Sequence, residues 1–170
     1  MNQQIKSLRG LSQLATIVLL SLSQHACAQT ENQQQLVDAC VSINHRYALA
    51  RDHADQKAYA DLFTSDAEFI MQGESFAGIE RILERIGSGN SQNFARLLIT
   101  TVDISPIDAT TATGVTYFIM YMAAESGEPK LPITKFQVFM GEYHDEYKLT
   151  ADGCKFTRRE TKPLFIGESS

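Results

Sequence analysis

The chain has 170 residues, enough for one domain with a hydrophobic core, and it carries a net charge of −5 at pH 7. This acidic balance, together with the lack of any basic cluster, argues against nucleic acid or an anionic membrane surface as a partner. The three cysteines form no C-x-x-C pair and the four histidines form no cluster. The sequence therefore predicts no metal site and no cofactor.

The start of the chain differs in composition from the rest. Lys6 and Arg9 precede an apolar run over residues 11–22, and Ala26-Cys27-Ala28 has the small residues of a cleavage site. This order is typical of a secretory signal peptide. The apolar run is too short, and too often interrupted by Ser and Gln, to span a bilayer securely. We therefore predict a signal peptide over residues 1–28.

A single domain is then expected over residues 29–170, in the periplasm or outside the cell. The alternative is a lipoprotein acylated at Cys27. After cleavage behind residue 28, Cys40 and Cys154 remain. An oxidising compartment allows a disulfide between them, and two buried thiols are the other possibility.

The first half of the domain reads as helical. Apolar residues recur at steps of three and four over residues 33–53, which predicts an amphipathic helix. A second short helix is expected over 55–63, with Asp55 as its N-cap. A short strand over 67–70 follows, and a third helix is expected over 78–87.

The second half has the composition of strands. Four segments are rich in β-branched and aromatic residues and are separated by turn signals; they are residues 95–104, 111–124, 133–148 and 155–165. Helices followed by strands predict an α+β fold. We expect a cone-shaped α+β barrel in which three N-terminal helices pack on a bent antiparallel sheet. The inside of such a cone is the default place for a ligand.

Several short motifs appear in a recognisable order along the domain. They are Arg46-Tyr47-Ala48 with Asp52, Asp61-Leu62-Phe63-Thr64-Ser65-Asp66-Ala67, Phe76-Ala77-Gly78, Thr111-Ala112-Thr113-Gly114, Gly141–Tyr147 and Asp152-Gly153-Cys154-Lys155-Phe156. Their order and spacing resemble the SnoaL-like family of the nuclear transport factor two-like superfamily. The resemblance implies the cone fold, a small hydrophobic ligand in its cavity, and a homodimer.

The same resemblance suggests which residues would do chemistry. Scytalone dehydratase, bile acid 7α-dehydratase and hexachlorocyclohexane dehydrochlorinase belong to this family and remove a small leaving group from a hydrophobic ring. They use a His–Asp dyad in which the histidine takes the proton and the aspartate orients it. By similarity of spacing the aspartate falls on Asp52, and a helix tyrosine falls on Tyr47. These two are the candidate catalytic residues.

The dyad is incomplete in this sequence. The resemblance places its histidine at Leu97, and leucine has no proton chemistry. Met71 stands where two of the relatives have a pocket tyrosine. We therefore expect Leu97 and Met71 to line the cavity as binding residues, together with Phe63, which faces inward after the second helix, and Tyr117, in the middle of a strand.

Two functions from different classes remain open. One is an exported protein that binds a small hydrophobic molecule and has lost the dyad. The other is a dehydratase-like lyase or isomerase acting on a cyclic or polyketide-like compound, with Asp52 as general base.

Two histidines are interpreted as surface residues without a catalytic role. His45 is expected on the surface of the first helix, and His144 on the charged, solvent-facing side of its strand.

Overall fold

The computed structural model describes residues 30–90 and 93–169. The predicted signal peptide over 1–28 lies outside these residues. The main compact unit is Leu36–Ser170. Within the described part of the chain, no helix has the length and apolar character needed to cross a membrane.

The helices form close to where the sequence predicts them. The first runs over residues 30–52, α2 is Gln56–Ala60 and α3 is Ile79–Asn90. Asp55 caps α2 as expected, because its Oδ1 accepts a hydrogen bond of 2.9 Å from the backbone N–H of Ala58.

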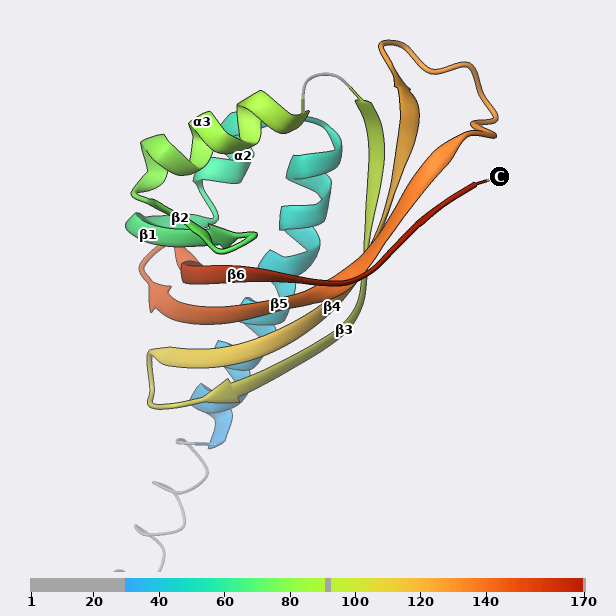
Figure 1. The fold of residues 1–170 in the computed structure, drawn as a ribbon. Coiled ribbons are helices and arrows are strands. Elements are labelled where there is room, and N and C mark those ends of the chain that lie inside the picture. Colours follow the sequence, from blue (N-terminus) through green and yellow to red (C-terminus); the bar gives the residue numbers. More distant parts are fainter. Residues whose placement is uncertain (1–29, 91–92, 170) are drawn as a thin grey trace, which may run out of the picture. The chain divides into compact units, whose positions relative to one another are not determined.

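Six strands form one open sheet, and the helices pack on it (Figure 1). The strands are β1 (Phe63–Met71), β2 (Glu74–Ala77), β3 (Asn93–Pro106), β4 (Thr111–Ser126), β5 (Phe136–Thr150) and β6 (Gly153–Glu168). Their order across the sheet is β2-β1-β6-β5-β4-β3. The predicted α+β architecture is confirmed.

One strand pair runs in a direction that the sequence did not indicate. Strands β3 to β6 form an antiparallel meander, but β1 lies parallel to β6, with Phe63 beside Phe156. The sheet is therefore mixed. The alternation of side chains reports which face each residue occupies and carries no information on strand direction.

The two faces of β5 differ as the alternation predicts. Tyr143, Asp145 and Tyr147 are buried on the face that packs against the helices, which we call the inner face. The alternate side chains point to the opposite, outer face, where Glu142 and His144 are joined by a hydrogen bond of 2.8 Å. The inner face thus combines a charged residue with aromatic ones.

A β-bulge changes the phase of β6. Tyr147 pairs with Phe156, whereas the adjacent Glu146 pairs with Arg158, so Thr157 is an extra residue on β6. Phe156 and Arg159 consequently both face inward although they are three residues apart, and each is fully buried. Without the bulge, strict alternation would place Arg158 inside.

A disulfide joins the first helix to the sheet. Cys40 and Cys154 are bonded, with Cα atoms 5.3 Å apart and a sequence separation of 114. This decides between the two states that the sequence left open. The cross-link fixes one turn of the helix against the start of β6.

We expect the double variant Cys40→Ala/Cys154→Ala to lose about 4 kcal/mol of unfolding free energy, because so long a loop is no longer closed in the unfolded chain. Urea unfolding measures the loss. Reduction of the wild type with dithiothreitol should lower its stability comparably and should leave the double variant unchanged. Two titratable free thiols in the unfolded, unreduced wild type would contradict the cross-link.

Candidate functional site

A buried arginine lies at the centre of the inner face. Arg159 has a fully buried side chain, and its guanidinium carbon lies 4.2 Å from the ring centroid of Tyr47, 4.1 Å from that of Tyr143 and 3.9 Å from that of Phe156. Aromatic faces carry partial negative charge and attract such a cation. Three rings from the helix, β5 and β6 therefore enclose the guanidinium.

Asp145 neutralises this cation from the neighbouring strand. It pairs with Arg159 in the ladder, and its carboxylate accepts hydrogen bonds of 2.8 Å from Nε and 2.7 Å from Nη2. Tyr147 donates a further hydrogen bond of 2.8 Å to the same carboxylate. The paired, two-point geometry holds the guanidinium plane in one orientation.

Asn44 connects this ion pair to the helix. Its Oδ1 accepts hydrogen bonds from Nη2 of Arg159 and, at 3.2 Å, from Thr116. Its Nδ2 donates at 3.0 Å both to the hydroxyl of Tyr147 and to the carbonyl of Cys40. All four positions of the amide are thus used, and the network ends at the disulfide.

Burial and charge fix the protonation states here. Burial alone would lower the pKa of Arg159, but the Asp145 carboxylate outweighs it and raises that pKa, so the guanidinium stays charged. Burial raises the pKa of Tyr59 and of Tyr143 well above the usual value, and the neighbouring Tyr47 adds to this effect. The hydroxyls of Tyr59 and Tyr143 are therefore neutral hydrogen-bonding groups.

Two polar atoms on the inner face of β6 are left without a partner. Nη1 of Arg159 and Oγ1 of Thr161 are both buried and form no hydrogen bond with any described residue. Thr161 pairs with Tyr143 and with Met71, which places it next along the same face. Buried polar groups are almost always hydrogen-bonded, so this pair indicates a place where a polar ligand atom would be stabilised.

Asp52 is held at the edge of the sheet. Its Oδ1 accepts a hydrogen bond of 2.9 Å from the backbone N–H of Leu97, on the edge strand β3, and its side chain is 10% exposed. Its Oδ2 lies 4.0 Å from Nε of Arg96. The position aligned with the dyad histidine is thus adjacent to Asp52, but it contributes a backbone N–H and a buried, apolar side chain.

The charge of Asp52 is only partly compensated. Burial raises the pKa of this carboxyl above its usual value, while the Leu97 N–H and the Arg96 guanidinium act in the opposite direction. The hydrogen bond goes to strand β3 and not to the turn that follows the helix. Asp52 therefore joins the helix end to the sheet edge.

The other predicted lining residues are found in different places. Tyr47 and Phe63 are buried in the aromatic core, with ring centroids 6.4 Å apart. Met71 is partly buried against that core, and its sulfur accepts a contact of 3.2 Å from Arg85. These residues lie on or near the inner face, together with Leu97.

Tyr117 does not lie there. Its neighbours Thr116 and Phe118 are buried on the inner face, so the Tyr117 side chain points to the outer face, where it is 40% exposed. The prediction that Tyr117 lines the interior is wrong. The strand itself was located correctly. Its side chains alternate between the two faces, and the prediction gave Tyr117 the wrong face.

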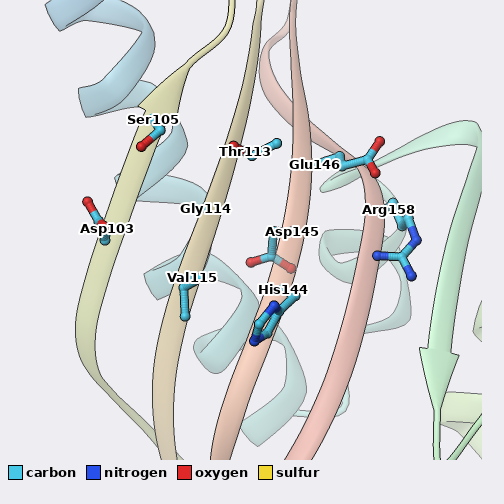
Figure 2. Close-up of a pocket in the computed structure, with 9 residues that line it drawn as sticks. All are labelled: Asp103, Ser105, Thr113, Gly114, Val115, His144, Asp145, Glu146 and Arg158. Carbon is cyan, nitrogen blue, oxygen red and sulfur yellow. The ribbon is translucent and has the colours of Figure 1, made fainter.

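His45 and His144 both lie away from the buried network around Arg159. His45 is exposed on the helix, as predicted. His144 lines a shallow hollow of about 290 Å³ on the sheet, with Asp103, Glu146 and Arg158 among its neighbours (Figure 2). His144 is hydrogen-bonded to Glu142, and Arg158 forms ion pairs with Glu68 and Glu160. No group of three metal-ligating side chains occurs among the described residues.

Sequence reasoning missed the residues that organise the interior. Asn44 lies on the predicted buried stripe, one turn from Cys40, and a polar residue in that position was the available signal. Arg159 and Thr161 could not be assigned, because the bulge at Thr157 reverses the face that alternation gives them.

We expect Asp52→Asn to gain stability relative to the wild type as the pH rises above about 4, until the pH has passed through the raised pKa of Asp52 in the folded protein. The folded state raises the pKa of Asp52, so the stability linked to its protonation is present at low pH and is lost as the pH rises through that pKa. Asparagine keeps the acceptor for Leu97 and does not titrate. Urea unfolding across this pH range measures the difference.

Asp52→Ala provides the matched control, because it removes the acceptor and should cost about 1 kcal/mol at acid pH. A pH-independent difference between Asp52→Asn and the wild type would show that the carboxyl is not destabilised by burial.

Comparison with known proteins agrees with this architecture. A family model described as SnoaL-like domain matches residues 34–160. The fold is similar to a hexachlorocyclohexane dehydrochlorinase, LinA type 2 (TM-score 0.71, 12% identity, covering 83% of this chain and 93% of that one). It is also similar to a candidate scytalone dehydratase from Novosphingobium aromaticivorans (TM-score 0.70, 16% identity, 83% and 92%).

A third similar structure is ActVI-ORFA from Streptomyces coelicolor, with a TM-score of 0.61 and 16% identity, covering 74% of this chain and 95% of that one. No protein of curated function matches the chain. At these identities the structures show the common fold alone, whereas the family model spans most of the chain. The chain therefore belongs to the SnoaL-like domain family.

Proposed function

We propose that this protein is exported and binds a small, largely apolar molecule against the inner face of its sheet. The observation that carries the proposal is the pair of buried polar atoms without partners, Nη1 of Arg159 and Oγ1 of Thr161. A ligand oxygen would supply the missing hydrogen bonds. The dehydrochlorinase and dehydratase among the similar structures support a ring compound as the ligand.

An apolar wall lies further along the same face. Leu97, Met120, Phe139 and Ile166 are in register across β3, β4, β5 and β6. Phe139 is four residues from Tyr143, the partner of Thr161, which is about 13 Å along a strand. Met71 and Met120 are partly buried, and unbranched methionines adapt their conformation readily. This length suits an elongated ring compound with an oxygen at one end.

The incomplete dyad supports binding over elimination. Leu97 offers no proton acceptor, and the Oδ1 atom of Asp52 is already occupied by a backbone N–H. A base must reach the proton that it removes. Binding requires none of this chemistry.

A lyase or isomerase on a cyclic or polyketide-like compound is the second candidate. It is favoured by one observation: burial raises the pKa of Asp52 toward the range in which a carboxylate is a useful base. In this case Asp52 would act alone, and Asp52→Asn would abolish turnover while retaining ligand binding.

Mass spectrometry of small molecules recovered from the protein separates the two candidates. The protein is incubated with sterols, bile acids, cyclic hydroxyketones and aromatic polyketides. Enrichment of an unchanged compound is expected for a binding protein. Recovery of a dehydrated or isomerised compound would establish the lyase or isomerase, and enrichment of nothing in this panel would overturn the proposal.

We expect Thr161→Val to weaken binding of an enriched compound about tenfold, by removing one hydrogen bond. The folded protein should not lose stability, because this hydroxyl has no partner to lose. Isothermal titration and thermal unfolding measure the two quantities. Thr64→Val is the matched control: its hydroxyl is also buried without a partner, but it lies on β1, next to the inward-facing Phe63. Equal effects of both variants on binding would contradict the assignment.

We infer that a second copy of the chain covers the outer face of the sheet. Leu98, Ile119, Met140 and Phe165 form an apolar row in register there, and Phe165 is 64% exposed. Apolar side chains of one row that are exposed on one face, here Leu98 and Phe165, are a common feature of subunit interfaces.

Phe165→Glu should therefore shift the protein from dimer to monomer in analytical ultracentrifugation. Ile166→Glu makes the same change at the next residue, whose side chain lies on the inner face beside Phe139, and should leave the dimer intact. A wild-type monomer at micromolar concentration would exclude the interface.

A further inference from the structure

We propose that the interior site selects a neutral oxygen, as in a ketone, and rejects a carboxylate on the same ring scaffold. The inference rests on the proposed function and specifies the chemical class of its ligand. It follows from what already surrounds Arg159, the only arginine or lysine that is fully buried among the described residues.

The first argument is charge balance. Arg159 and Asp145 are both fully buried and form a two-point ion pair. The cation is therefore already neutralised before a ligand arrives. A second carboxylate at Nη1 would leave one net negative charge inside the protein, and burying an uncompensated charge is far more costly than burying a carbonyl. The remaining N–H groups of Nη1 are nevertheless good donors to a neutral oxygen.

The second argument is the aromatic surroundings. The faces of Tyr47, Tyr143 and Phe156 are turned toward the guanidinium at 3.9–4.2 Å. The partial negative charge of these faces stabilises the cation and repels an anion placed beside it. Both arguments point to the same class of ligand, and they rest on different atoms.

Thr161 extends the argument to a second oxygen. Its hydroxyl can donate or accept and has no partner among the described residues. It lies two residues beyond Arg159 on the same face, about 7 Å along the strand. A cyclic ketone with a further hydroxyl or keto group satisfies both positions and remains uncharged.

The test compares two compounds of almost the same shape. 2-Acetylnaphthalene and 2-naphthoate differ in a methyl group against a carboxylate oxygen. At pH 7.5 we expect the ketone to bind the wild-type protein at least about tenfold more tightly than the carboxylate, measured by isothermal titration. Lowering the pH toward 5 should strengthen naphthoate binding in proportion to its neutral acid form and leave ketone binding unchanged.

Asp145→Asn removes the negative charge that neutralises Arg159 and changes the shape of the side chain little. In this variant Arg159 is no longer neutralised, and naphthoate should gain at least about tenfold in affinity relative to the ketone. Circular dichroism verifies that the variant is folded. Should it fail to fold, the wild-type pair and its pH dependence decide the inference alone.

Naphthoate binding as tight as or tighter than the ketone at pH 7.5 would overturn the inference. Failure of 2-acetylnaphthalene to bind would do the same. Neither result would overturn the proposed function, which is decided by enrichment from the wider panel. Tighter binding of the ketone by the wild type, together with a relative gain in naphthoate affinity in Asp145→Asn, would confirm the assignment of Arg159 as the oxygen-binding group.

Discussion

The buried ion pair between Arg159 and Asp145 is the interaction on which the interior depends. A charged pair in a protein core is stable only when the remaining hydrogen-bonding groups are also satisfied. Here Asn44 and Tyr147 satisfy most of them, so the helix and strands β4, β5 and β6 must all be in place at once. This requirement makes the network a device for specifying one arrangement of helix and sheet, and it leaves one guanidinium nitrogen for a ligand.

The fold was readable from the sequence because its signals are local. Helical periodicity around Tyr47, the cap at Asp55 and the alternating strands of the second half each report on a few neighbouring residues. The strand direction of β1 and the bulge at Thr157 depend on distant pairing, and no local pattern contains them. Arg159 was therefore passed over, although it lies at the centre of the inner face. Tyr117 was misplaced for a different reason: its strand was located correctly, but its side chain points to the outer face.

The candidate site shows the same division. Resemblance to the SnoaL-like family placed Asp52 beside Leu97, and the structure confirms that the two are adjacent. The resemblance could not show which atoms of Asp52 and Leu97 are in contact. In the relatives that the resemblance points to, this aspartate orients a histidine, whereas here Asp52 accepts a hydrogen bond from the backbone of the edge strand β3. The carboxylate of Asp52 therefore has a structural role in this chain, independent of any chemistry in which it takes part.

The disulfide has a consequence beyond the stability of the domain. Cys40 lies in the first helix and Cys154 at the start of the last strand, so the cross-link encloses α2, α3, β1 to β5 and all the loops that connect them. A protease that cuts any one of these loops leaves two fragments that are still covalently joined. The cut chain keeps its partners at high local concentration and can return to the same structure. A domain of this design tolerates nicking at its surface, which is an advantage wherever proteases are present and reducing agents are not.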